Sequence, residues 1–310
     1  MAEYLVNGYA YPSISEETLL WWLPRLTWLS AFSYGFTAEG RLVNLADENL
    51  VTAANAAGVR PMMVLTPLDA EGRFNDNIAA AVFEDPEAQT NLIDNIEANL
   101  HAKNIGGVDF DFEYIPRVYA ADYVELVART QRLLSPQGYL TSVALAPKVR
   151  ADQPGVLYEG HDYAGMGRAA DYCLLMTYEW GYTYGEPMAV SPINHVRRVL
   201  EYGLTEIPAE KILMGMSNYG YDWALPFVRG ESKAEKLTNY QAQARAEYYG
   251  VPVEWDETAQ APFYTYATPA GVKHIVWFEN ERSWQARLAL VAEYGLTGVS
   301  IWNIMHVFYG

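Results

Sequence analysis

The chain alternates short apolar runs with helical patterns almost from end to end, and this rhythm constrains the fold more than any other feature. The apolar runs are continuous, as expected for strands that are buried on both faces of a sheet. The eight predicted strands cover residues 4–9, 28–34, 60–65, 107–112, 140–145, 172–177, 212–216 and 299–302. Eight βα repeats predict an α/β fold of the (β/α)8 TIM-barrel type. The alternative is an open doubly wound sheet, although no G-x-G-x-x-G follows the first strand.

Helix start and stop signals fall between these runs. Ser13 with Glu16 indicates a capping box, while Asp85-Pro86 pairs an N-cap residue with a proline at the first helical position. Ser191-Pro192 repeats that signal, and its helix is expected to stop at Gly203. The predicted helices contain residues 19–23, 47–57, 92–100, 119–134, 192–203 and 283–294.

One interval, residues 220–282, is too long for a single crossover between strands. It contains a predicted helix over 238–249 and strand-like pieces at 253–255, 263–266 and 273–278. We therefore expect a small α+β insertion between the seventh and eighth barrel strands, where insertions usually wall the active-site cleft. The expected organisation is a single catalytic barrel over residues 1–310 that carries this insertion.

Composition excludes several classes of partner. The chain has 21 Lys and Arg against 38 Asp and Glu, a net charge of −17, so it repels phosphate backbones and we expect no nucleic-acid partner. Apolar runs are far shorter than the roughly 18 residues of a membrane span, so we expect no membrane insertion. Cys173 is the only cysteine, which excludes an intramolecular disulfide. Aromatic residues make up 14% of the chain, which suits either a large core or a sugar site.

The most informative segment is residues 106–114, GGVDFDFEY, which alternates strictly between apolar and acidic residues. One face carries Val108, Phe110 and Phe112, and the other carries Gly107, Asp109, Asp111 and Glu113. In a barrel the apolar face packs on the helices, so the three acids point inward and climb toward the C-terminal mouth. Because stacked carboxylates repel one another and resist desolvation, at least one should hold a proton near neutral pH.

Three interpretations of this acidic strand stay open from the residues alone. It could be a solvated edge strand, or it could bind a divalent cation, although no histidine lies near it in the sequence. Coupled carboxyls also suit glycoside hydrolysis, where a protonated acid donates to the leaving oxygen. Neighbouring inward residues on one strand are too close to flank a bond in the usual two-carboxylate way. This favours a mechanism in which the substrate supplies the nucleophile.

Residues 106–113 resemble the D-G-x-D-x-D-x-E motif of glycoside hydrolase family 18, with Gly106 in place of its first Asp. Residues 176–179, Met-Thr-Tyr-Glu, resemble the family's M-x-Y-D on strand 6. Tyr219 resembles its strand 7 tyrosine, and Trp302 its strand 8 tryptophan. Segments 176–181, 187–192 and 276–280 look like the spore-cortex and peptidoglycan-lytic branch, whose members often carry N-terminal LysM modules.

The resemblance implies roles for individual residues. Glu113 is expected to be the general acid, Asp111 to hold the acetamido group of the substrate, and Tyr178 to donate a hydrogen bond to that group. The further substrate-binding residues are expected to be Asp109, Met176, Glu179, Tyr219 and Trp302. No metal and no cofactor is expected. Taken singly, the aromatic residues and Met176 are typical of a core, and only their joint placement opposite the acids favours a site. The five histidines show no ligand spacing and are expected at the surface or in packing.

The expected function is a retaining hydrolase that cleaves β-1,4 links after N-acetylglucosamine in cortex peptidoglycan or a chitin-like glycan. The alternative is a catalytically dead barrel that binds N-acetylglucosamine polymers, and an endo-acting enzyme on N-glycan cores would share the same chemistry. The expected partner is an N-acetylglucosamine-containing polysaccharide, and the protein is expected to be a monomer. Such a function implies a secreted, spore or cell-wall location, although residues 1–11 show no signal peptide.

Overall fold

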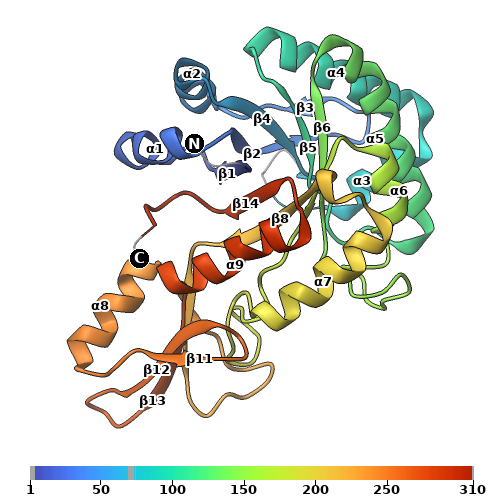
Figure 1. Cartoon of the computed structure of the whole chain (residues 1–310). Helices are drawn as coiled ribbons and strands as arrows, with labels where there is room; N and C mark the ends of the chain where they lie inside the picture. The colour runs from blue at the N-terminus through green and yellow to red at the C-terminus, as the bar shows by residue number, and fades with distance from the viewer. Residues whose placement is uncertain (1–3, 69–72, 74, 309–310) are drawn as a thin grey trace.

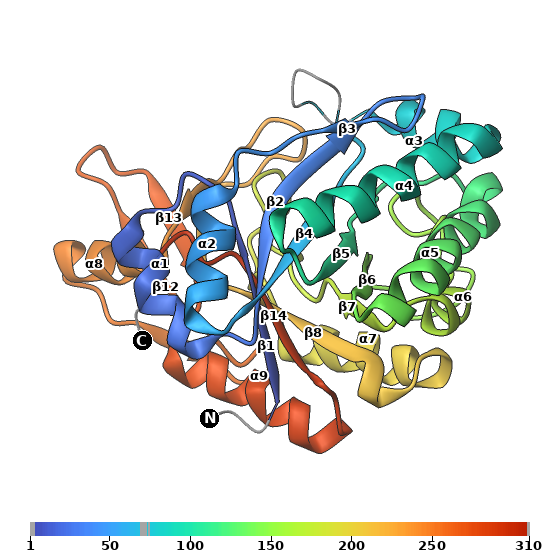
Figure 2. The same cartoon turned by 90° about the horizontal axis from the view of Figure 1, so that it is seen from above.

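Eight parallel strands close into a barrel in the computed structural model, which describes residues 4–68, 73 and 75–308. The first strand pairs in parallel with both the second and the last, so the ring is complete (Figures 1 and 2). The barrel strands are β1 (Leu5–Ala10), β2 (Trp28–Phe36), β4 (Arg60–Leu65), β5 (Gly107–Phe110), β6 (Leu140–Leu145), β7 (Tyr172–Leu175), β8 (Ile212–Ser217) and β14 (Gly298–Trp302). The predicted (β/α)8 barrel is confirmed.

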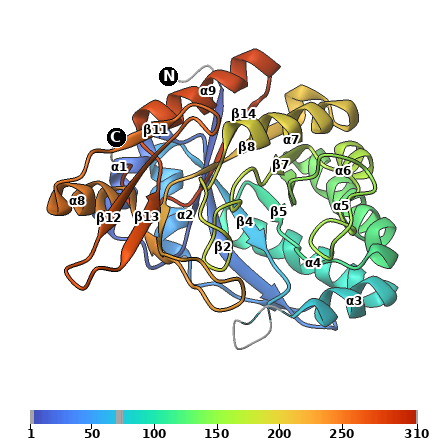
Figure 3. The same cartoon turned by 90° about the horizontal axis from the view of Figure 1, so that it is seen from below.

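Helices surround the barrel and bury their apolar faces against its outer surface (Figure 3). They are α1 (Glu16–Trp22), α2 (Glu48–Ala57), α3 (Asp76–Glu84), α4 (Pro86–Lys103), α5 (Ala120–Leu134), α6 (Tyr163–Ala169), α7 (Ile193–Glu206) and α9 (Glu281–Tyr294). Short 3-10 turns lie at Leu23–Arg25, Arg117–Tyr119, Ser135–Gln137 and Ala209–Lys211, and β3 (Leu42–Val43) extends β2 by an antiparallel pair. Among the described residues, no helix combines the length and apolar character that a membrane crossing needs.

Helix caps follow the sequence signals in part. Asp85 caps α4 as predicted, because its carboxylate accepts a hydrogen bond from Glu87 N at 2.9 Å. The cap of α1 is Ser15 and not Ser13, since the Ser15 hydroxyl accepts from Thr18 N. Helix α7 runs past Gly203 to Glu206, so the predicted stop was wrong. A Cβ at Gly203 would lie 2.8 Å from Leu175 Cδ1, and the glycine therefore permits close packing of α7 on β7.

Two predicted strands end earlier than expected, and both end where the cleft begins. The ladder of β5 stops at Phe110, although Asp111 N still donates to Leu65 O at 3.0 Å. Strand β7 stops at Leu175, where Thr177 N turns back to Leu175 O at 2.8 Å. The chain leaves the sheet through tight turns at these positions, which frees the following side chains to face the mouth of the barrel.

The predicted insertion between the last two barrel strands is a five-stranded antiparallel sheet with one helix, to the lower left of the barrel in Figure 1. Its elements are β9 (Gly220–Ala224), β10 (Glu235–Leu237), α8 (Asn239–Tyr249), β11 (Glu254–Asp256), β12 (Ala261–Ala267) and β13 (Lys273–Trp277). The sequence did not predict β9 and β10. Strand β9 buries Asp222, a residue type depleted in strands, which accepts hydrogen bonds from His274 of the adjacent strand β13 and from Tyr266 of β12.

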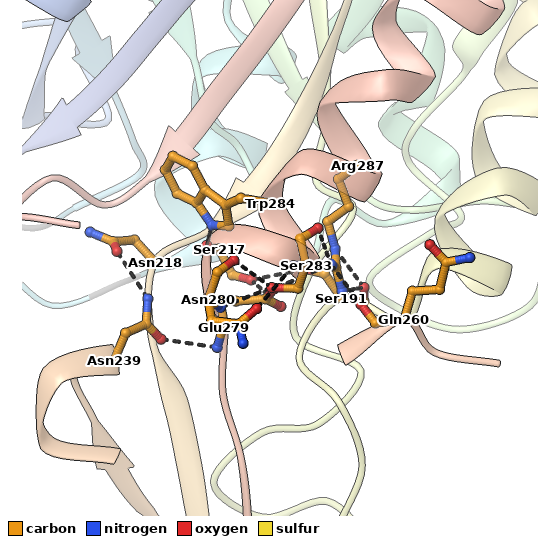
Figure 4. Close-up of polar contacts among 10 residues, drawn as sticks. All are labelled: Ser191, Ser217, Asn218, Asn239, Gln260, Glu279, Asn280, Ser283, Trp284 and Arg287. Carbon is orange, nitrogen blue, oxygen red and sulfur yellow. Dashed lines mark hydrogen bonds and ion pairs between the residues drawn. The ribbon is translucent and has the colours of Figure 1, made fainter. Parts of the chain in front are cut away.

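A buried polar network joins the insertion to the barrel (Figure 4). The Arg287 guanidinium of α9 lies 3.2 Å from the Glu279 carboxylate and donates to Ser191 O at 2.8 Å. Glu279 also accepts from Ser217 at the end of β8 and from Ser283 of α9. Burial raises the pKa of Glu279 and lowers that of Arg287, but each charge has the other as its partner.

Candidate active site

A cleft of about 560 Å³ opens at the C-terminal ends of the barrel strands, the position where barrel enzymes carry their sites. Segments that follow β1, β5, β6 and β7 line it, together with residues of β2, β14 and the insertion. Six of the eight residues that the sequence singled out lie in this lining: Asp111, Glu113, Met176, Tyr178, Glu179 and Trp302. The other two, Asp109 and Tyr219, lie behind it.

Asp109 lies below the cleft inside the barrel, with only 2% of its surface exposed. Its two carboxylate oxygens accept hydrogen bonds from Tyr9 and Ser142, each at 2.6 Å. Burial raises the pKa of Asp109, and these two hydrogen bonds act in the opposite direction. Both oxygens are thus bonded to the protein, and Asp109 does not line the cleft in which the sequence analysis expected it to bind substrate.

Asp111 lies at the cleft wall, between Asp109 and Glu113 along the chain. Its Oδ1 atom is buried and has no hydrogen-bond partner among the described residues. Burial raises the pKa of Asp111 well above its usual range, and the charges of Glu113 and Asp109 add to this effect. A buried carboxyl oxygen without a donor is costly, so this atom is ready to bind a proton or a donor group of a ligand.

Tyr178 faces the same carboxyls from the end of β7. Burial raises the pKa of its phenol well above 10, and the charges of Asp111 and Glu113 raise it further, so the hydroxyl keeps its proton and can donate it in a hydrogen bond. The ring lies against Gly215 of β8, where a Cβ would be 2.7 Å from Tyr178 Cε1. The glycine thus makes room for the tyrosine ring.

Two non-glycine residues of the cleft adopt left-handed backbone conformations. Tyr114 has φ of 56° directly after Glu113, and Glu179 has φ of 65° directly after Tyr178. Such conformations cost free energy for residues with a Cβ and concentrate at functional sites. In both segments the chain reverses immediately beyond the residue expected to do chemistry, and the reversing residue itself lines the cleft.

Tyr219 contacts Glu179 and does not line the cleft. Its hydroxyl donates to Glu179 Oε1 at 2.5 Å, and the Tyr221 hydroxyl donates to the same atom at 3.0 Å. Tyr221, which the sequence did not single out, is the tyrosine of this pair that faces the cleft. Their spacing of two residues places both on one face of the extended chain, a signal that could have found Tyr221.

Trp302 lies at the end of β14 among aromatic rings that the sequence did not connect with it. The ring centroids of Phe32, Tyr9 and Tyr11 lie 4.8, 5.6 and 6.1 Å from that of Trp302, all edge to face. Phe32 and Tyr11 also line the cleft. The indole is therefore held in a fixed orientation by its neighbours, as a platform for an apolar ring face requires.

His161 is a buried packing residue beneath the site. Its Nδ1 accepts from Ala146 N at 2.7 Å, so its Nε2 donates to Phe112 O at 2.9 Å. Burial lowers the pKa of His161 to about 4, which keeps the ring neutral. Through these two hydrogen bonds His161 connects Phe112, between Asp111 and Glu113, to Ala146 just after β6.

Within the described ranges, no three His, Cys, Asp or Glu side chains are grouped as a metal site would need.

Comparison with known proteins assigns the chain to a family. The model of glycosyl hydrolases family 18 matches residues 73–306, and the chain belongs to this family. The match confirms the family that residues 106–113 resembled in the sequence. It also supports the expectation that the protein is a glycoside hydrolase.

Two of the similar proteins are spore enzymes. The chain is 39% identical over 281 residues to the cortical fragment-lytic enzyme of Bacillus subtilis, an alignment that covers 91% of this chain and 65% of that protein. The crystal structure of the Bacillus cereus spore cortex-lytic enzyme SleL superposes with a TM-score of 0.93 at 34% identity, over 97% of this chain and 71% of that one. A chitinase from Chromobacterium violaceum shares the fold, with a TM-score of 0.89 at 24% identity over 99% of this chain and 95% of that one. The chain thus spans about two thirds of the length of its spore relatives.

Proposed function

We propose that this protein is a retaining glycoside hydrolase that cleaves β-1,4 links after N-acetylglucosamine in spore-cortex peptidoglycan, by substrate-assisted catalysis. The observation that carries the proposal is the carboxyl oxygen of Asp111 that has no partner in the described part of the chain, beside Glu113 and Tyr178 in one cleft. The similarity to cortex-lytic enzymes supports the choice of glycan. We also propose that residues 1–310 act as one catalytic unit, as a monomer.

In the proposed first step Glu113 transfers its proton to the glycosidic oxygen as the bond to the anomeric carbon breaks. The carbonyl oxygen of the substrate's own 2-acetamido group forms a bond to that carbon, which gives an oxazolinium ion. Asp111 accepts the acetamido N–H, which supplies the donor that its Oδ1 lacks, and its negative charge stabilises the cation. Tyr178 donates its hydroxyl proton in a hydrogen bond to the acetamido oxygen.

In the proposed second step a water molecule attacks the anomeric carbon and Glu113 accepts a proton from it. The ring opens to regenerate the acetamido group, and the two inversions retain the configuration. Trp302, held by its aromatic neighbours, provides a flat surface below the sugar. Met176 and Glu179 complete the proposed binding surface, with Tyr219 acting through its hydrogen bond to Glu179.

The decisive experiment compares N-acetylated and de-acetylated versions of one defined oligosaccharide. We expect hydrolysis only of the acetylated version, because no other group on the substrate can form the oxazolinium ion. A thiazoline mimic of that ion should inhibit as an intermediate analogue. Equal rates on both substrates would exclude substrate assistance. Tight binding without hydrolysis would favour the alternative, a non-catalytic barrel that binds N-acetylglucosamine polymers. Faster hydrolysis of N-glycan cores than of peptidoglycan would show that the substrate is an N-glycan.

A further inference from the structure

The segment that carries Asp111 and Glu113 is held through its backbone from outside the cleft. Phe112 lies between the two acids and is fully buried, with its ring stacked on that of Tyr123 at a centroid distance of 5.1 Å. Its carbonyl oxygen accepts a hydrogen bond from Nε2 of His161 at 2.9 Å. Because a peptide unit is planar, a fixed Phe112 carbonyl also fixes the N–H and the Cα atom of Glu113.

The His161 ring supplies one acceptor and one donor to two backbone groups. Ala146 N donates to Nδ1 at 2.7 Å, so the proton of the neutral ring is on Nε2, which donates to the Phe112 carbonyl. An apolar ring of similar size would fill the same space, but it would remove both hydrogen bonds from buried backbone groups. Packing alone therefore does not explain a histidine at this position.

His161 is itself held at the end of β6. Its backbone carbonyl accepts a hydrogen bond from Lys148 Nζ at 2.9 Å, and its N–H donates to Tyr158 O at 3.1 Å. Lys148 and Ala146 both follow directly on β6. The imidazole therefore connects a segment of fixed position to the segment that carries the two acids.

Glu113 depends on such support because it lies beyond the last residue of the β5 ladder, which is Phe110. The segment of His161 also approaches the chain after Glu113, since a Cβ at Gly160 would lie 2.2 Å from the carbonyl oxygen of Ile115. A general acid must reach the glycosidic oxygen, and a displacement of about 1 Å can cost about a hundredfold in rate. The residue that orients the peptide before Glu113 therefore affects the rate of the chemical step.

We propose that His161 is a positioning residue for the reaction, which acts through the Phe112 carbonyl to hold Glu113 where it can protonate the glycosidic oxygen. The inference rests on the proposed function and adds to it a residue that does not touch the substrate. Because His161 does not line the cleft, its effect belongs to kcat and not to KM.

Two substitutions separate the two hydrogen bonds of the ring. The amide oxygen in His161→Asn lies as many bonds from the backbone as Nδ1, so it can keep the bond from Ala146 N, but the bond to Phe112 is lost. The amide N–H in His161→Gln reaches as far as Nε2, so it can keep the bond to Phe112 and loses the other. Each variant leaves one buried backbone group without its partner, and we expect similar decreases in Tm.

The two variants should differ in rate. We expect kcat on an acetylated oligosaccharide to fall about tenfold or more in His161→Asn, with KM changed less than about twofold, and to stay within about threefold of wild type in His161→Gln. The matched control is Tyr163→Phe, which removes a hydroxyl that bonds the backbone of Ala146 and Lys148 but makes no contact with Phe112. This control should lower Tm and keep kcat.

Equal losses of kcat in the Asn and Gln variants, or full kcat in the Asn variant, would overturn the inference, because in a purely structural role the rate follows stability. Should His161→Asn fail to fold, a loss of about tenfold in folded His161→Gln would overturn it as well. A wild-type protein that hydrolyses no acetylated oligosaccharide marks failure of the proposed function instead. Crystal structures of the variants then still decide the inference: a Glu113 displaced in the Asn variant and unmoved in the Gln variant supports it, and an unmoved Glu113 in both refutes it.

Discussion

At the scale of single residues, the site contains three carboxyls at alternate positions of β5 and the segment that follows it, each in a different environment. Asp109 has both oxygens bonded to protein hydroxyls, while Asp111 has one buried oxygen without a partner among the described residues. Glu113 follows at the cleft, beyond the last residue of the β5 ladder. On this basis we propose a supporting role for Asp109 and roles in the chemistry for Asp111 and Glu113.

Glu113→Gln should abolish turnover and leave folding and sugar binding intact. The amide keeps the shape of the carboxyl but has no proton to give, and loss of a general acid typically costs about 10² to 10⁴ in rate. Initial rates on a defined acetylated oligosaccharide and the Kd for its product provide the two readouts. Wild-type turnover in the variant would place the acid elsewhere.

Asp111→Asn should lower activity about a hundredfold or more while making the protein no less stable at neutral pH. The folded-state pKa of Asp111 lies above the 3.8 of an ordinary Asp, so the folded state binds the proton more tightly than the unfolded chain. This carboxyl therefore destabilises the fold increasingly as pH rises above about 4. We expect the Tm of the variant to equal or exceed that of wild type at pH 7, with the difference shrinking toward pH 4. A variant that melts well below wild type at pH 7 would contradict this account.

At the scale of elements, the turns that directly follow the barrel strands carry most of the site residues. Strands β5 and β7 leave the sheet at Phe110 and Leu175, and the chain then reverses through Tyr114 and Glu179 in left-handed conformations. The neighbouring strand β8 carries Gly215 next to Tyr178. Because a glycine has no side chain, it leaves space for the Tyr178 ring.

Gly215→Ala should therefore reduce both stability and kcat. Its Cβ would lie 2.7 Å from Leu175 O and 2.7 Å from Tyr178 Cε1, and overpacking of this kind typically costs about 1–3 kcal/mol. The control is Gly58→Ala at the end of α2, where φ is 71° but no atom lies within 4 Å of the added Cβ. That variant should lose about 1 kcal/mol through backbone strain and keep full kcat. Equal kcat values for the two variants would show that the Tyr178 ring does not depend on Gly215.

At the scale of the whole molecule, the insertion and the barrel share the cleft and must be held together. The insertion supplies Tyr221 and Lys236 to a lining that the barrel otherwise provides. The buried pair of Arg287 and Glu279 lies at the junction, and it joins α9, the end of β8 and the segment at Ser191 (Figure 4).

Arg287→Met should destabilise the protein strongly, because it leaves the Glu279 carboxylate buried without its cation. Breaking a buried pair in this way typically costs about 3–5 kcal/mol of unfolding free energy, measurable by denaturant titration. Adding Glu279→Gln should recover part of that loss. The control is Arg132→Met, which breaks an exposed pair with Glu125 at 2.8 Å and should cost less than about 1 kcal/mol. Equal losses for the two arginine variants would show that the buried pair does not hold the junction.

The sequence by itself determined the barrel, the acidic strand and the family. Period-two alternation over residues 107–113 forces three acids onto one face, because successive side chains of an extended chain point to opposite sides. Continuous apolar runs separated by helical patterns have few arrangements that bury both faces of each strand, and a closed barrel is one of them. Caps such as Asp85 are equally local, since the donor and acceptor lie two residues apart.

Only the tertiary structure decided how the rest of the cleft is assembled. The partners of Glu179 lie 40 and 42 residues further along the chain, and the rings around Trp302 come from β1, β2 and the segment beyond β1. Strands β9 and β10 were missed because a buried Asp222 and exposed charges hide the alternation of a strand. Such contacts have no spacing rule in the sequence, since the folding of the whole barrel sets the distances between residues that come from different strands.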